Sequence, residues 1–375
     1  MNEQQELVTI TSLGYGLDRQ QRTLWKGIEE RFHGVEPNHI PTIIVKRNDE
    51  VKQFFVLYCN GEPVGRAAVT VDKRWIETKA ENLGFIDDLI IDPMRIELAH
   101  KLIDRCLAAL KRQGIKGAIA RAQGFPALAA QKFEELPPFG LPSNPPQYID
   151  LYEQHGFVKH KEWANFRFTL PIEASGSALA RWEKCLTSLR AEAKPLNTRN
   201  RRELKEYSDL SYEVLMDHFG YTPMRFMDSY SFIKFLVFGF FCRLTRFRVY
   251  VLRDKSGNMV GFFSYSPDYN IALKPLTTYL NRYNPLALPR FMLSLRRTKR
   301  AAIGAIGLSE EARRKGFIRA VDFGLGMVRE EGYEQLDTGP VLIENAVVVK
   351  MIQAFQQRYD VGMEHMKYYT LLYRF

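Results

Sequence analysis

Apolar and polar residues alternate along two similar stretches of the chain, each interrupted by a turn signal. Residues 53–71 contain two β-rich runs around Asn60-Gly61, a dipeptide typical of a two-residue hairpin turn. Residues 248–265 repeat this order, with a strand, a turn that contains Gly257, and a second strand that opens on Val-Gly. The pattern therefore predicts an antiparallel hairpin in each half of the chain.

The elements that follow each hairpin also agree in their order. An apolar strand comes next, at 85–91 in the first half and at 301–308 in the second, and it leads into an amphipathic helix that ends at a Gly. A further strand, a segment with an Asn, a second helix and a final aromatic strand follow. The helices are expected at 97–113 and 317–331, the next strands at 117–121 and 334–337, and the final strands at 165–170 and 368–375. Agreement of so many consecutive elements predicts a tandem duplication.

The order of elements also predicts the fold class. Hairpin, strand, helix, strand, helix and strand form an α+β fold, in which each half is a mixed, mostly antiparallel sheet flanked by helices. One strand-helix-strand crossover in each half is expected to be parallel. A segment with Ser and Gly after Glu173, and Lys194-Pro195 beyond it, mark the boundary between the halves. We predict an N-terminal domain at 1–170, a linker at 171–193 and a C-terminal domain at 194–375.

Composition indicates the number of domains and gives the net charge of the chain. At 375 residues, with 46% hydrophobic and 26% charged residues, the chain fits two globular domains and not a disordered or fibrous protein. Lys and Arg number 53 while Asp and Glu number 43, which gives a net charge of +10. This excess favours an anionic partner, such as nucleic acid, an anionic membrane face or a phosphate-bearing cofactor. Nucleic acid is the least favoured of these, because no recognised nucleic-acid-binding motif accompanies the charge.

Cysteine and histidine spacing argues against a metal site. The four cysteines form no C-x-x-C pair, and the seven histidines include no H-x-x-x-H or H-E-x-x-H spacing. Residues 1–20 lack the basic start and apolar core of a secretory signal, and no apolar run approaches the roughly 20 residues that a membrane-spanning helix needs. We therefore expect a cytoplasmic protein without a metal cofactor.

A basic turn follows the apolar strand of the second half. Arg313, Arg314 and Lys315 precede Gly316 and Phe317 at the start of the predicted helix. A Gly lets backbone N–H groups approach an anion, and the N-terminus of a helix adds about half a positive charge. The segment therefore fits a pyrophosphate, although the same residues also fit a basic loop ahead of an amphipathic helix.

This turn resembles the signature Q/R-x-x-G-x-G/A of the GNAT superfamily of CoA-dependent N-acyltransferases. It matches the signature at Arg313 and Gly316 and departs from it at Ile318. The resemblance implies that the second half binds acetyl-CoA or a longer acyl-CoA, and that the acyl group passes directly to an amine. The CoA-binding residues that it implies are Ile306, Leu308, Arg313, Arg314, Lys315, Gly316, Phe317 and Asn345.

Other segments resemble a bacterial group of two-domain GNAT-like proteins, to which bacterial ceramide synthases are related. The likeness lies in Val64-Gly65-Arg66 and 144–159 of the first half and in 267–274 of the second. It implies a small or lipid-like amine as the acceptor. The substrate-binding residues that it implies are Asp268, Asn270, Asn144 and Tyr148.

Attack of an amine on a thioester needs a base for the ammonium proton and an acid for the leaving thiolate. The candidate bases are Asp337, Glu344 and Asp268, each of which also fits a turn or a helix cap. Tyr152 resembles the tyrosine with which the family protonates the thiolate, and Tyr369 is a candidate in the second half. The sequence therefore predicts acid–base chemistry without a covalent intermediate.

The two halves are unequally equipped. The first half has no Gly in the turn at 92–99, where its phosphate loop would be. It is expected to be a degenerate copy that completes the acceptor cleft. A catalytically silent tandem scaffold that binds a ligand or a partner is the alternative to an acyl-CoA-dependent enzyme.

Residues 289–300 stand apart from both repeats. They interleave apolar side chains with four Arg and one Lys. This pattern fits a surface helix with its cations in water, or a helix that contacts the face of an anionic membrane.

Overall fold

The computed structural model describes residues 7–32, 50–79, 81–122, 124–138, 140–170, 191–219, 244–274, 287–310 and 326–375, with isolated residues between 176 and 187 and at 242 and 312. The predicted linker lies mostly outside these residues. The chain forms two compact units. Unit 1 comprises Met1–Ala164, Leu342–Glu344 and Met366–Phe375, and unit 2 comprises Asn165–Val341 and Asn345–His365.

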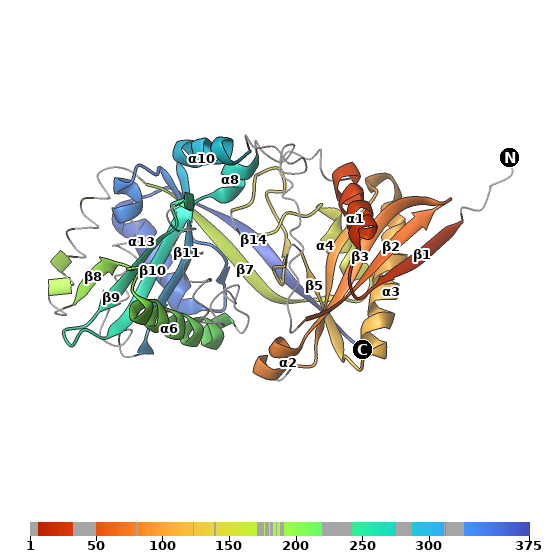
Figure 1. Ribbon diagram of the computed structural model, residues 1–375, viewed down its shortest axis with the longest axis horizontal. Coiled ribbons are helices and arrows are strands. Elements are labelled where there is room, and N and C mark those ends of the chain that lie inside the picture. The colour runs from red at the N-terminus through yellow and green to blue at the C-terminus, as the bar shows by residue number, and fades with distance from the viewer. Residues whose placement is uncertain are drawn as a thin grey trace. The chain divides into compact units, whose positions relative to one another are not determined.

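Unit 1 contains the first predicted hairpin, the strand that follows it and the helix that crosses over to the next strand (Figure 1). Asn60 and Gly61 in the hairpin turn have positive φ angles of 52° and 82°, as a two-residue turn requires. The elements of its N-terminal part are β1 (Val8–Gly14), α1 (Arg19–Phe32), β2 (Glu50–Cys59), β3 (Glu62–Asp72), α2 (Lys73–Lys79), β4 (Gly84–Ile91), the 3-10 helix η1 (Pro93–Leu98), α3 (Ala99–Arg112), β5 (Gly117–Arg121), β6 (Leu128–Ala129), α4 (Gln147–Gln154) and β7 (Val158–Thr169), whose last residues enter unit 2.

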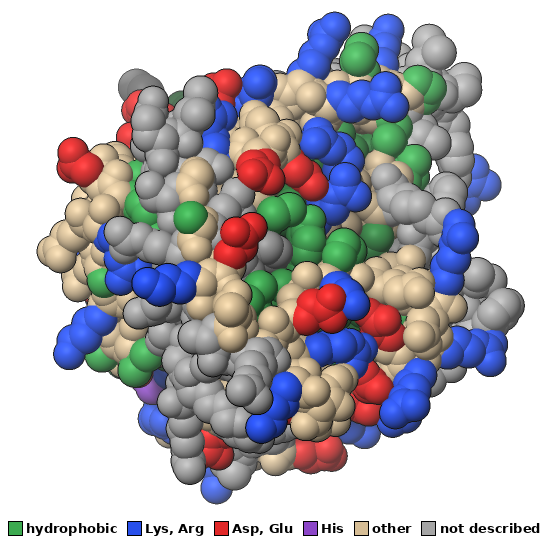
Figure 2. Space-filling view, turned by 90° about the vertical axis from the view of Figure 1, so that its left-hand side faces the viewer, with side chains coloured by type: hydrophobic (Ala, Val, Ile, Leu, Met, Phe, Trp, Pro, Cys, Tyr) green, Lys and Arg blue, Asp and Glu red, His purple; other side chains and the backbone are tan. Residues whose placement is uncertain are grey.

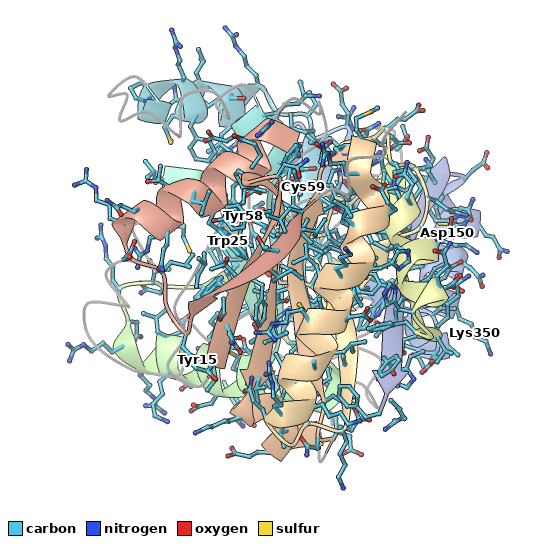
Figure 3. All side chains as sticks on the ribbon, turned by 90° about the vertical axis from the view of Figure 1, so that its right-hand side faces the viewer. Tyr15, Trp25, Tyr58, Cys59, Asp150 and Lys350 are labelled. Carbon is cyan, nitrogen blue, oxygen red and sulfur yellow. The ribbon has the colours of Figure 1, made fainter. Side chains whose placement is uncertain are left out.

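Helices α1 and α3 cover opposite faces of the unit 1 sheet, because side chains alternate along each strand. On one face Trp25 of α1 packs on Phe54 and Ala68, and Figure 3 shows Trp25 between α1 and the strands. On the other face Leu102 and Cys106 of α3 pack on a larger apolar cluster from the same strands. The strands are thus buried on both faces, so charged side chains on them need partners inside the unit.

Unit 2 contains the second predicted hairpin and the two strands expected after it, whereas most of the helix predicted at 317–331 lies outside the described residues. Helix α6 packs on the second hairpin through Tyr207, Val251 and Phe262. The elements that follow β7 are β8 (Glu192–Pro195), α6 (Arg201–Phe219), β9 (Arg248–Arg253), β10 (Met259–Pro267), α8 (Tyr269–Leu273), α10 (Ala287–Arg297), β11 (Arg300–Leu308), β12 (Gln335–Asp337), β13 (Val341–Leu342), α13 (Ala346–Tyr359) and β14 (Met363–Arg374), most of which belongs to unit 1.

The two hairpins match residue by residue at one pair of glycines. Gly65 of β3 pairs with Ile91 of β4, and Gly261 of β10 pairs with Leu308 of β11. A Cβ atom on either glycine would lie 2.6 Å from the side chain of its partner. The Val-Gly that recurs in the sequence therefore marks the same close approach in both units.

Replacing Gly261 with Ala is expected to lower the free energy of unfolding by about 1–3 kcal/mol, because the added methyl overpacks the contact with Leu308. Urea unfolding measures this change. The matched control is Gly27→Ala, since a Cβ on this glycine of α1 meets nothing within 4 Å. That control is expected to raise stability by about 0.5–1 kcal/mol, because Ala favours a helix more than Gly does. If Gly261→Ala left the free energy of unfolding unchanged, the close approach of Gly261 to Leu308 would be contradicted.

The final strand of each half completes the sheet of the other half. Residues 165–169 of β7 belong to unit 2, where Phe168 pairs with Leu336 of β12. Most of β14 belongs to unit 1, where Leu372 pairs with Ile119 of β5. The expectation that 165–170 and 368–375 each close their own half is wrong on this point. Both strands carry the same alternation of apolar residues, and alternation fixes which face is buried but not which strand is the neighbour.

Candidate functional site

Strands β11 and β12 of unit 2 separate after a short parallel pairing. Residues 300–302 of β11 pair with β12, and β11 then continues to Leu308. Within the described residues β12 ends at Asp337, so 303–308 have no strand partner on that side. The two strands form a fork, and its open edge offers backbone N–H and C=O groups to a ligand.

A β-bulge lies in β11 just beyond the start of the fork. Ser264 of β10 pairs with Ala305 and its neighbour Tyr265 pairs with Ile303, so Gly304 is the extra residue. Gly304 is exposed and its two neighbours in β11 are half-buried, whereas the strand is buried at both of its ends. A bulge redirects backbone groups, and N–H groups aimed into an open site can polarise a carbonyl.

Two buried carboxylates lie at the base of this fork. Arg300 joins them, because its Nη2 lies 2.6 Å from Oδ2 of Asp268 and its Nε lies 3.3 Å from Oδ2 of Asp337. Arg167 contacts Oδ1 of Asp337 at 3.0 Å, and Asn165 donates a hydrogen bond of 2.7 Å to the same oxygen. The network thereby ties β7, β11 and β12 to the end of β10.

Burial shifts both carboxyl groups toward the protonated form. It raises the pKa of Asp268 to about 6 against the attraction of Arg300, and the charge of Asp337 adds to the increase. Burial likewise raises the pKa of Asp337 against Arg167 and Arg300. Both side chains are fully buried, so they hold the fork together and do not meet solvent directly.

The residues predicted to bind CoA are described only in part. Ile306 is half-buried in the open stretch of β11, whereas Leu308 is buried in an apolar cluster. Ser309 opens the predicted phosphate loop and accepts a hydrogen bond of 3.2 Å from the backbone N–H of Ala312. The remaining loop residues lie outside the described part of the chain, namely Arg313, Arg314, Lys315, Gly316 and Phe317.

The segment before α13 contains two predicted site residues. Asn345 caps this helix, because its side-chain oxygen accepts a hydrogen bond of 3.4 Å from the backbone N–H of Val348. Glu344 precedes it and is exposed. Among the three predicted bases, Glu344 is thus the one that solvent reaches, since Asp268 and Asp337 are buried.

The predicted tyrosines of the first half lie in the core of unit 1. Tyr148 and Tyr152 of α4 are buried in the apolar cluster that contains α3. Burial raises the pKa of Tyr152 well above its usual value, and the neighbouring Cys106 adds to this shift. The structure does not bring either hydroxyl to the fork of unit 2, which is a separate unit.

The other predicted substrate residues make local contacts. The side chain of Asn144 accepts a hydrogen bond of 2.6 Å from the N–H of Ala129 and donates one of 3.2 Å to its carbonyl. Asn270 is buried, and its backbone N–H donates to Asp268 at 2.9 Å, which caps α8. Tyr369 is half-buried in unit 1. The structure thus brings Asp268, Asn270 and Asp337 together and leaves Asn144 and Tyr369 elsewhere.

Unit 1 has an equivalent fork, and paired charged residues lie at its base. Asp87 ends the pairing between β4 and β5, and its carboxylate forms an ion pair with Arg121. Burial alone would raise the pKa of Asp87, but Arg121 and Lys52 lower it to about 2. Asp88 follows with a positive φ of 53° and accepts a hydrogen bond of 2.7 Å from Lys52. Every residue of β4 is buried, so unit 1 lacks the open strand of unit 2.

The turns after the two fourth strands also differ in charge. Asp92 donates its N–H to the carbonyl of Val64 at 2.8 Å, and Ser309 makes the same bond to Val260 at 2.9 Å, so their positions are equivalent. The carboxylate of Asp92 accepts the N–H of Met94 at 3.0 Å. In unit 1 a negative side chain thus occupies the position from which a phosphate loop begins, which disfavours an anionic ligand.

Arg300, Arg167 and Asn165 are not among the residues predicted from the sequence. Asn165 and Arg167 stand between apolar residues of β7, and Arg300 opens the otherwise apolar β11. A polar residue in such a buried strand needs a buried partner. That pattern is the signal that could have found them, but it does not name the partner.

Two solved structures share this architecture. A tandem GNAT protein from the clavulanic acid biosynthesis pathway matches over 98% of each chain, with a TM-score of 0.53 and 10% identity. A GCN5-related glucosamine N-acetyltransferase region of a fungal multi-domain beta-N-acetylglucosaminidase matches 98% of this chain, with a TM-score of 0.53 and 11% identity. This chain spans 38% of the length of that fungal protein. No family model and no curated protein matches the sequence.

These likenesses define the class of fold. The protein has the tandem GNAT fold, with the predicted α+β architecture of mixed sheets flanked by helices. The likeness to bacterial ceramide synthases stays a prediction.

Proposed function

We propose that the protein is an acyl-CoA-dependent N-acyltransferase that moves an acetyl or longer acyl group to an amine at the fork of unit 2. The open stretch of β11 carries this proposal. Its bulge at Gly304 is exposed and its edge has no strand partner among the described residues. The corresponding strand of unit 1 is wholly buried, and its own Asp87 and Asp88 pair with Arg121 and Lys52.

Acyl-CoA is the substrate in this proposal, and it supplies a thioester. The pantetheine arm would lie along the free edge of 303–308, where backbone groups can pair with its amides. The N–H groups around Gly304 would polarise the thioester carbonyl. The diphosphate would bind the basic turn at 313–316, as the sequence predicts.

The chemistry then needs one acid–base cycle. The amine attacks the thioester carbon, the new C–N bond forms and the C–S bond breaks. Water is the proposed carrier of both protons, because Asp268 and Asp337 are buried and Glu344 and Tyr369 belong to unit 1. It takes the ammonium proton, and the leaving thiolate takes a proton from water. Asp268 and Asp337 act as positioning residues through Arg300, since neither carboxylate reaches solvent.

One substitution tests the binding of acyl-CoA. Gly316→Glu is expected to abolish the thermal shift caused by acetyl-CoA or palmitoyl-CoA, because a carboxylate in the turn repels the diphosphate. Ser256→Glu adds the same charge to an exposed turn of unit 2 and is the matched control. Release of free CoA thiol by the parent protein measures turnover. A parent protein that shows no shift with either acyl-CoA would refute the proposal.

A silent scaffold is the second candidate. It is favoured by the burial and ion pairing of Asp268 and Asp337 and by the position of Tyr152 in the core. In that case the parent protein binds acyl-CoA but releases no thiol with polyamines, amino sugars or sphingoid amines as acceptors.

A further inference from the structure

The segment from Tyr269 to Ser309 contains no acidic residue. Its Lys and Arg residues are Lys274, Arg282, Arg290, Arg296, Arg297, Lys299 and Arg300. These cations account for most of the net charge of +10. Arg300 is neutralised by the two buried carboxylates, and Lys299 lies 3.5 Å from Glu334. Helix α10 itself contains no acidic residue.

Helix α10 has an inner and an outer face of different character. On the inner face Leu295 is fully buried and packs on Tyr269 and Ala272 of α8. The outer face carries exposed Arg290, Arg296 and Arg297, together with Pro289. At its centre Leu293 is 48% exposed, so an apolar side chain lies among these cations on the outer face.

The figures agree with this arrangement. Figure 2 shows Lys and Arg side chains gathered with hydrophobic ones at its upper right, over α10. In Figure 3 side chains that end in nitrogen project from this helix, at the upper left, away from the molecule. The cations of the outer face are exposed.

We infer that the outer face of α10 docks on the surface of an anionic phospholipid membrane. Its guanidinium groups match the negative headgroups in charge, and each cation near such a surface adds to the attraction. Leu293 and Pro289 reach the boundary of the acyl chains, where burial of apolar surface is favourable. A nucleic acid would gain from the same cations but offers no apolar layer for Leu293. No helix in the described part of the chain is long and apolar enough to cross a bilayer, so the contact is peripheral.

This inference does not depend on the proposed acyl transfer, because it concerns vesicle binding alone. The experiment is co-sedimentation of the full chain with vesicles of phosphatidylglycerol and phosphatidylcholine, and with pure phosphatidylcholine, at about 0.15 M salt. We expect binding to the anionic vesicles only. The triple variant Arg290→Gln, Arg296→Gln and Arg297→Gln is expected to weaken binding on the order of 100-fold, and Leu293→Ser by several-fold.

The matched control removes the same charge from another exposed site. Arg199→Gln, Arg201→Gln and Arg202→Gln alter exposed cations at the start of α6 and are expected to change binding by less than about 3-fold. Thermal unfolding checks that each variant is folded. Three results would each overturn the inference. They are an equal loss of vesicle binding in the two triple variants, equal binding of the parent protein to both vesicle types, and retention on duplex DNA without vesicle binding.

Discussion

A chain that lacks residues 366–375 is expected not to fold its N-terminal unit, although the deletion lies at the opposite end of the sequence. Leu371, Leu372 and Tyr368 are buried in unit 1, and Leu371 belongs to the same apolar cluster as α3. Without β14, the strand β5 loses its partner on one side. The apolar cluster around α3 also loses the side chain of Leu371. The single change Leu371→Ala is expected to lower the free energy of unfolding by about 2–5 kcal/mol.

Hydrogen exchange followed by mass spectrometry tests this expectation directly. The deletion and Leu371→Ala should reduce the protection of β5 and α3, whose residues precede the change by more than two hundred positions in the sequence. Val347→Ala is the matched control, because Val347 is an exposed apolar residue of α13. If residues 99–121 of the truncated protein kept their full protection from hydrogen exchange, the pairing of β14 with the sheet of unit 1 would be incorrect.

Substitution of Arg300 by Ala is expected to lower the free energy of unfolding by about 3–5 kcal/mol, because it leaves Asp268 and Asp337 buried without their shared cation. The neighbouring Lys299 pairs with Glu334 at the surface, so Lys299→Ala is the matched control. Lys299→Ala should lower the free energy of unfolding by no more than about 1 kcal/mol. Urea unfolding of both variants gives the comparison.

The decrease in the free energy of unfolding caused by Arg300→Ala should be smaller at pH 5 than at pH 7.5. The pKa of Asp268 is raised to about 6 by burial, and removal of Arg300 can only raise it further. At pH 5 the carboxyl group is therefore mostly protonated, and one of the two buried charges disappears. A loss that is equal at both pH values would show that the network does not control stability through its charges.

Sequence pattern predicted the elements around the fork well. The hairpin turn at Asn60-Gly61 followed from the need for two positive φ angles, which few residue types adopt. The strand at 301–308 followed from its run of apolar residues, and the interleaved cations of 289–300 fitted a surface helix, which the structure has at Ala287–Arg297. Such features depend on the residues themselves and their nearest neighbours, so the sequence carries them directly.

Side-chain partners were harder to predict. The end of a strand indicates Asp337 and the resemblance of 267–274 indicates Asp268, but their burial and their common contact with Arg300 depend on how β10, β11 and β12 meet. The same holds for Tyr152, whose place in the core of unit 1 depends on packing against α3. Residues far apart in the chain become partners only when the strands are assembled, and a single sequence does not record those distances.

The sequence by itself determined that this protein is a duplicated α+β chain, because periodicity, turn residues and the recurrent Val-Gly are local properties. Tertiary structure decided which strand completes which sheet, and which fork stays open. In unit 1 Asp87 and Asp88 pair with Arg121 and Lys52 and every residue of β4 is buried, whereas in unit 2 the bulge at Gly304 is exposed. The physical reason is that strand pairing and ion pairing are set by distances in space, and both sheets accept strands of the same alternating pattern.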